Sequence, residues 1–334
     1  MPRRPLVVHR GPRCPQIALA GRRRTDAGTI LCGMPRRPQL PQPLIRRYFP
    51  VQLAVKRGLI RRSQLRTSAW RRLFQGIYVD ASVPDTHRLR CAAAAAYLLP
   101  ETAAIAGRSA ATLYGTGLCR ADDPVEVLVP RSSPVPSVRG LRVHTGTLEP
   151  HEIRIVAEIP VTEPVRTCWD LALWVDLVEA VVIVDRMLAS GRVSTAELAD
   201  YAAARHGPRR RGARRFAKVL VLADGRAESP QESRLRVGLH LAGLPRPEVQ
   251  YTIFGPDGFI ARVDLAWPEL KIAIEYDGLT HVGSARQMHN DRRRLNRLVA
   301  EGWIVLHVTA ERLRDDFPRF VTEVKAARRS RLRG

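Results

Sequence analysis

Three acidic residues interrupt two otherwise apolar stretches between Arg262 and His281. Asp264 lies in VDLAW, and Glu275 and Asp277 lie in IEYDG. An unpaired carboxylate in a core strand costs free energy. Taken singly, each acid fits the solvent face of an edge strand. Gathered on one face, with Asp-Gly and a histidine following, the three acids predict a functional site.

Strand geometry predicts that the acids meet. If a two-residue loop at 269–270 joins the strands, Asp264 lies directly opposite Glu275, and alternation puts Asp277 on the same face. Three carboxylates so close repel one another unless a cation offsets their charge. Mg²⁺, or Mn²⁺, accepts such oxygen ligands, and Glu232 of the preceding helix could close the site. A metal there would activate water and stabilise charge on a phosphate.

The surrounding pattern predicts the elements that hold these acids. Ser229 is a helix cap, and Pro230 suits the first turn that follows. The C-terminal elements are then a helix at 229–244, strands at 248–255, 259–267 and 270–278, a helix at 285–302, and a strand from 303 onward. Their order is α-β-β-β-α-β.

This order and five motifs resemble one known group of nucleases. The motifs are VDLAW, IEYDG, His281, NDRRRLNRL and EGWIVLHVT, and together they cover about residues 229–315. The block resembles the PD-(D/E)XK, or restriction-endonuclease-like, superfamily, and in particular its very-short-patch-repair-like (Vsr-like) endonuclease domain. The resemblance implies a Mg²⁺-dependent DNA endonuclease, a phosphodiester hydrolase.

Residue roles follow from the resemblance. Asp264 and Glu275 would be metal ligands, and Asp277 stands where the wider superfamily usually has lysine. Glu232 matches a helix acid often seen ahead of this core. His281 could protonate a leaving group or orient water. Because the lysine is missing, His281 or an arginine would have to supply its charge.

Two arginines of the following helix are candidates for contact with the scissile phosphate. Arg293 and Arg294 lie in NDRRRLNRL, close to Asp291. Either could bind phosphate or pair with that aspartate, and an i,i+3 helix pair between Asp291 and Arg294 is the simpler interpretation.

The N-terminal part predicts a second DNA-binding element. Residues 44–85 read as helix, turn, helix and hairpin, the order of a winged helix. Arg61, Arg62, Arg71 and Arg72 would line its second helix and wing. The segment resembles more loosely the winged-helix start of AbiEi-type antitoxins. A small helical hairpin that binds protein is the alternative interpretation.

Composition favours a polyanionic partner. The 334 residues include 55 Lys and Arg against 32 Asp and Glu, a formal charge of +23. DNA, or another nucleic acid, is the expected partner, although arginine richness also accompanies GC-rich genomes. Five scattered cysteines form no C-x-x-C pair, which favours a reduced, cytoplasmic protein. The longest apolar segment, 177–189, contains Glu179 and Asp185, so no membrane span is expected.

The predicted fold class is α/β, of the multi-domain α+β type. Its predicted divisions are a disordered basic arm at 1–43, the winged-helix region at 44–85, a mixed α/β middle domain at 86–204, a basic linker or helix at 205–228, the nuclease domain at 229–325 and a basic tail at 326–334.

Two functions from different classes fit these features. The first is a metal-dependent DNA endonuclease that its N-terminal region guides to DNA. The alternative is an antitoxin-type DNA-binding transcriptional regulator with an inactive nuclease fold. Self-association or a partner in a defence system is a third possibility. The intact set of acids favours the enzyme, and the missing lysine favours the regulator.

Overall fold

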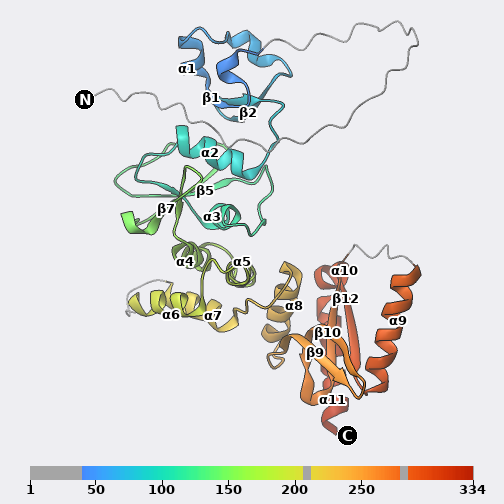
Figure 1. The fold of residues 1–334 in the computed structure, drawn as a ribbon. Coiled ribbons are helices and arrows are strands. Elements are labelled where there is room, and N and C mark those ends of the chain that lie inside the picture. The colour runs from blue at the N-terminus through green and yellow to red at the C-terminus, as the bar shows by residue number, and fades with distance from the viewer. Residues whose placement is uncertain (1–39, 206–211, 279–284, 334) are drawn as a thin grey trace, which may run out of the picture. The chain divides into compact units, whose positions relative to one another are not determined.

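A computed structural model describes residues 40–205, 212–278 and 285–333. The described chain has a mixed α/β fold with three sheets (Figure 1). This agrees with the predicted α+β class. Most of the predicted basic arm, 1–43, lies outside the described residues.

The chain divides into two compact units. One comprises the residues up to Ile105 together with Cys119–Val161, and the other comprises Ala106–Leu118 together with the chain from Thr162 onward. The predicted middle domain, 86–204, is therefore shared between them. Its first helix and its strands belong to the first unit, and its later helices, from Gly107–Leu113 onward, belong to the second.

The first unit begins with a small antiparallel sheet, in the order β1-β3-β2. Its elements are a 3-10 turn (Gln42–Leu44), β1 (Tyr48–Pro50), α1 (Val51–Lys56), β2 (Trp70–Phe74) and β3 (Ile77–Asp80). Where the winged-helix pattern predicts a second α-helix, the chain forms a 3-10 segment, Arg62–Arg66. None of its five residues is fully buried, and Leu65 is the one that packs, partly buried, against the core of this region, so the segment has little apolar surface to stabilise an α-helix.

A five-stranded mixed sheet, in the order β6-β5-β4-β8-β7, follows in the first unit. Its elements are α2 (His87–Tyr97), β4 (Ala104–Ile105), β5 (Val125–Val129), β6 (Leu141–Thr145), a 3-10 turn (Pro150–Glu152), β7 (Ile153–Val156) and β8 (Ile159–Thr162). All five residues of β5 are buried, as its position inside the sheet requires.

Helices make up the first part of the second unit. They are α3 (Gly107–Leu113), α4 (Pro164–Trp174), α5 (Leu177–Ala189), α6 (Thr195–Ala204) and α7 (Ala213–Leu222). The predicted linker, 205–228, contains α7, whose Phe216 and Val219 are fully buried, so this segment is part of the packed unit. Residues 206–211 lie outside the description. No helix in the described ranges is long and apolar enough to cross a bilayer.

The C-terminal elements follow the predicted order. They are α8 (Pro230–Leu241), β9 (Glu248–Gly255), β10 (Gly258–Trp267), a 3-10 turn (Pro268–Leu270), β11 (Ile272–Asp277), α9 (Ala285–Ala300), β12 (Ile304–Thr309), α10 (Ala310–Asp315) and α11 (Phe317–Arg333). The predicted tail, 326–334, is helical through Arg333, because alanines and arginines favour a helix and no glycine or proline stops α11 before Gly334.

These elements form three layers around a sheet in the order β12-β11-β10-β9 (Figure 1). One core cluster joins one sheet face to α8 and α11, and a second joins the other face to Leu298 of α9. Strand β11 has a neighbour on each side, and its Ile272, Ala273 and Ile274 are fully buried. The acids follow at the point where this buried run ends.

Candidate active site

Strands β10 and β11 separate where the acids lie. Their pairing includes Leu265 opposite Ile274, and continuing the same register opposes Asp264 to Glu275, as the sequence predicts. Instead of backbone pairing there, Asp264 Oδ2 accepts a hydrogen bond of 2.8 Å from the Tyr276 amide. The connection is longer than the predicted two-residue loop, because the 3-10 turn and Lys271, at φ 48°, form it.

Gln250 of β9 distorts the sheet on the other side of Asp264. Its φ is 54°, a left-handed conformation that is unfavourable for a residue with a Cβ. Val249 and Leu265 pack in one core cluster, whereas Tyr251 and Val263 pack in the other. The side chains of β9 and β10 therefore change sides at this point. Strain of this kind is typical of functional sites.

The Gln250 carboxamide joins two of the predicted acids. Its Nε2 donates to Glu232 Oε2 at 2.9 Å and to Asp264 Oδ1 at 3.2 Å. Glu232 Oε2 also accepts from the Glu228 amide at 2.9 Å, while the Glu232 amide donates to the Ser229 cap at 3.1 Å. The predicted cap is confirmed, and Glu232 lies beside Asp264 as expected. Gln250 is a site residue that the sequence interpretation missed.

Asp264 is the electrostatically unusual member of the group. The pKa of its carboxyl is raised to about 6, mainly because the group is largely withdrawn from water and also because of the negative charges of Glu232 and Glu275. Hydrogen bonds from the Tyr276 amide and Gln250 oppose that rise. Because two nearby carboxylates affect its pKa, Asp264 lies within electrostatic range of both, and a bound cation would relieve their repulsion.

Glu275 is paired with Arg294 of α9. The guanidinium donates to both carboxylate oxygens, at 2.7 and 2.6 Å, and this pairing raises the pKa of Arg294. The charges of Asp291 and Asp264 raise it further. Arg294 therefore lies in the site, with Glu275 as its ion-pair partner in place of the i,i+3 pair with Asp291. Arg293 is exposed.

Asp277 has a different partner from the other two predicted metal ligands. Its carboxylate oxygens lie 3.3 and 3.2 Å from Nδ1 of His307 on β12. His281 lies outside the described residues. Within the described ranges, no group of three or more His, Cys, Asp or Glu side chains is arranged to hold a metal ion. Asp264 and Glu275 remain a two-carboxylate set, which is the number Mg²⁺ commonly takes from protein.

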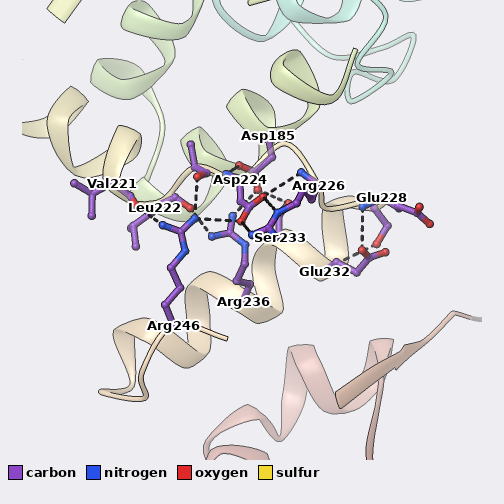
Figure 2. Close-up of polar contacts among 12 residues, drawn as sticks. Asp185, Val221, Leu222, Asp224, Arg226, Glu228, Glu232, Ser233, Arg236 and Arg246 are labelled. Carbon is purple, nitrogen blue, oxygen red and sulfur yellow. Dashed lines mark hydrogen bonds and ion pairs between the residues drawn. The ribbon is translucent and has the colours of Figure 1, made fainter. Parts of the chain in front are cut away.

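A buried ion-pair network holds the helix that carries Glu232. Figure 2 shows Arg236 and Ser233 of α8 directed at Asp185 of α5. Arg236 Nη2 and Ser233 Oγ each donate to Asp185 Oδ2 at 2.6 Å. The Asp224 amide donates to Asp185 Oδ1, also at 2.6 Å, and Arg236 donates to the Leu222 carbonyl. Glu232 adjoins Ser233, so these bonds fix its approach to the sheet.

The N-terminal arginines predicted to contact DNA differ in their exposure. Arg61, Arg62 and Arg72 are exposed. Arg71 is half-buried, and its guanidinium donates to the Val83 carbonyl at 2.5 Å and lies 3.7 Å from the Asp85 carboxylate. The first three therefore remain available for a polyanion, and Arg71 stabilises its own unit.

Fold and site together define a mixed α/β protein with a cluster of carboxylates at a break in its C-terminal sheet. No protein-family model matches the chain. It is 31% identical over 262 residues to the uncharacterized proteins MT2308 and Rv2248 of Mycobacterium tuberculosis strains CDC 1551 and H37Rv. Each alignment covers 78% of this chain and 93% of the relative. The chain belongs to the family of these two mycobacterial proteins.

One solved structure also shows a distant likeness. The crystal structure of the RV2827C protein from Mycobacterium tuberculosis aligns with a TM-score of 0.38 and 14% identity, over 63% of this chain and 84% of that one. A score this low does not assign a fold.

Proposed function

We propose that this protein is a metal-dependent DNA endonuclease that hydrolyses phosphodiester bonds. The observation that carries the proposal is the meeting of Asp264 and Glu275 where β10 and β11 separate. Asp264 bears a pKa of about 6 there because it is half-buried and lies near two other carboxylates. A fold gains no stability from such crowding, whereas a cation site needs it.

The element order also supports the proposal. Helix α8, strands β9 to β11, helix α9 and strand β12 follow the α-β-β-β-α-β order that the restriction-endonuclease-like resemblance implies. We infer a Vsr-like domain of this superfamily from that order together with the motifs. The AbiEi-like assignment of the N-terminal region is an inference of the same kind, and it rests on the hairpin and the exposed arginines Arg61, Arg62 and Arg72.

The residues present fit a hard divalent cation. Asp264 and Glu275 offer carboxylate oxygens, and Mg²⁺ commonly binds through one or two carboxylates, waters and substrate phosphate. Such an ion would supply an activated water and charge stabilisation at the phosphate. Gln250 orients the Asp264 carboxylate through its hydrogen bond. Arg294, close to both acids, would bind the negatively charged phosphate.

Plasmid cleavage tests the proposal directly. Supercoiled plasmid is incubated with the protein, with and without Mg²⁺ or Mn²⁺, and nicked and linear products are measured. We expect metal-dependent cleavage that Glu275→Ala abolishes. Glu269→Ala is the matched control, because Glu269 is an exposed acid in the turn of the same hairpin. If wild type and Glu275→Ala leave duplex, single-stranded and branched DNA equally intact, the proposal fails.

One observation favours the alternative function, a DNA-binding regulator with an inactive nuclease fold. Arg294 holds both oxygens of Glu275, and in a regulator this ion pair would be permanent. The regulator would bind promoter DNA through the exposed N-terminal arginines without cleaving it. A gel shift by a protein that cleaves no substrate, lost in an Arg61→Ala/Arg62→Ala variant, would support this alternative.

Substitution of Arg294 separates the two functions further. In the proposed enzyme, the metal and Arg294 compete for the Glu275 carboxylate. Arg294→Gln is therefore expected to tighten Mn²⁺ binding to the DNA-free protein by about tenfold. Tenfold corresponds to the loss of one competing charge interaction of roughly 1.4 kcal/mol. Isothermal titration calorimetry measures this, with exposed Arg293→Gln as the control. The same substitution is expected to slow DNA cleavage, because the phosphate loses its cationic partner. Unchanged Mn²⁺ affinity in Arg294→Gln would contradict the competition.

A further inference from the structure

His307 of β12 lies beside the candidate site, and the reaction proposed above does not use it. Strands β11 and β12 are parallel, and their register pairs Glu275 with His307 and Asp277 with Thr309. Paired residues on adjacent strands project to the same side of a sheet, about 4.8 Å apart. Asp277 is two residues beyond Glu275, so it projects to that side as well. The three side chains therefore form one group on the α9 side, at the carboxyl end of β11.

The contact between His307 and Asp277 fixes the orientation of the imidazole. Both Asp277 oxygens lie 3.2 to 3.3 Å from Nδ1, so Nδ1–H faces the carboxylate and Nε2 is directed away from it. The side chains are 40% and 37% exposed, which leaves Nε2 accessible to a large substrate. Arg312 Nη1 donates to the His307 carbonyl at 3.4 Å and holds the strand at this residue.

We propose that Asp277 and His307 form the proton-donating dyad of the nuclease. The inference rests on the proposed function, since it assigns the leaving-group step of that reaction. His307 is the catalytic residue, and Asp277 is a positioning residue that fixes the tautomer and stabilises the imidazolium, as carboxylates do for catalytic histidines. This role differs from the metal-ligand role predicted for Asp277.

The step balances as follows. The oxygen of water forms a bond to phosphorus, and the bond from phosphorus to the bridging sugar oxygen breaks. The leaving oxygen takes its electron pair and receives the Nε2 proton of the imidazolium, so it departs as an alcohol. Neutral His307 then regains a proton from solvent, and the proton of the attacking water passes to solvent. The protonated His307 imidazole also supplies a positive charge near the phosphate, in place of the lysine that the superfamily usually has.

A leaving group that needs no proton tests this assignment. Once the wild-type cleavage position is mapped, a duplex oligonucleotide is made in which sulfur replaces the leaving bridging oxygen. A thiolate leaves far more readily than an alkoxide because a thiol is a much stronger acid than an alcohol. We expect His307→Gln to lower kcat on the oxygen duplex about 10²-fold to 10⁴-fold, the range for one general acid, and on the sulfur duplex less than about tenfold. His240→Gln, at an exposed histidine of α8, is the control.

A spectroscopic measurement tests Asp277 separately. In ¹⁵N-labelled wild-type protein we expect His307 to carry its proton on Nδ1, and we expect Asp277→Asn to shift that population toward the Nε2 tautomer. Asp277→Asn should also lower kcat on the oxygen duplex with little change in KM, because it alters the acid and leaves the phosphate contacts intact.

The outcomes distinguish this inference from the proposed function. If wild type cleaves and Glu275→Ala does not, the proposed function stands. If His307→Gln then keeps the wild-type rate, or slows both duplexes equally, the dyad is overturned alone. An unchanged tautomer in Asp277→Asn overturns the positioning role. A wild-type protein that cleaves no substrate overturns the proposed function and the dyad with it.

Discussion

Asp264→Asn is expected to stabilise the metal-free protein and to abolish its cleavage of DNA. The wild-type carboxylate is half-buried and lies near Glu232 and Glu275, which together raise its pKa to about 6. Removing the charge removes the cost of withdrawing it from water and the repulsion from the two neighbouring carboxylates, so the free energy of unfolding at pH 8 should rise by about 1 kcal/mol. This is less than the roughly 3 kcal/mol that two pKa units represent, because asparagine cannot accept from both Gln250 and the Tyr276 amide. Cleavage should fall by about 10³-fold or more, through loss of a metal-binding and charge-stabilising group.

The stability gain has a defined dependence on pH. The folded-state pKa of Asp264 lies above its ordinary value of 3.8, so the folded protein binds this proton more tightly than the unfolded chain does. The cost of ionising Asp264 therefore appears as pH rises from about 4 to about 6 and is constant above that. In urea unfolding in EDTA, the stability of Asp264→Asn relative to wild type should therefore rise by about 2–3 kcal/mol between pH 4 and pH 8. The variant should be less stable than wild type at pH 4, where only its weaker hydrogen bonding counts, and more stable by about 1 kcal/mol at pH 8.

A matched substitution controls this experiment. Asp257→Asn changes an exposed aspartate in the turn between β9 and β10 and should alter neither stability nor cleavage. If Asp264→Asn destabilises the protein at pH 8 in EDTA, the crowding of carboxylates at Asp264 is contradicted. If it leaves cleavage intact, Asp264 has no part in the chemistry.

Breaking the buried pair between Asp185 and Arg236 is expected to cost about 3–5 kcal/mol of unfolding free energy. Both side chains are almost fully buried, and the carboxylate also accepts from Ser233 and the Asp224 amide. Asp185→Ala leaves a buried guanidinium without its counter-charge. The change should also displace α8, so cleavage should fall because Glu232 moves relative to Asp264. Urea denaturation and plasmid nicking measure the two effects.

The double variant separates the buried charge from the loss of packing. Asp185→Leu/Arg236→Met replaces both charges with apolar side chains of similar volume, and such replacements are often nearly neutral. We expect it to regain most of the stability that Asp185→Ala loses. Arg226→Ala is the control, because its ion pair with Asp224 is largely exposed on the arginine side and worth less than about 1 kcal/mol. A loss below 1 kcal/mol in Asp185→Ala would contradict the anchoring role of this pair.

The sequence by itself determined the local parts of the site. Alternation and the proline turn are enough to put Asp264 in register with Glu275, because pairing in a hairpin depends on residues close along the chain. The Ser229 cap and the element order from α8 to β12 follow from similarly local signals. The second α-helix of the winged-helix pattern was wrong for the complementary reason, since the 3-10 segment at that place, Arg62–Arg66, has only Leu65 against the core.

Tertiary structure alone decided the remaining contacts. A bulge between Phe259 and Ala261 shifts the β9–β10 register by one residue and so brings Gln250 opposite Asp264 in place of Val263. The contact of Asp277 with His307 depends on the parallel register of β12, which returns only after α9. Arg294 reaches Glu275 because α9 packs on that face of the sheet. Local pattern identified the acids and the register of Asp264 with Glu275, but the other partners of these acids depend on pairings between segments distant in sequence that no local pattern encodes.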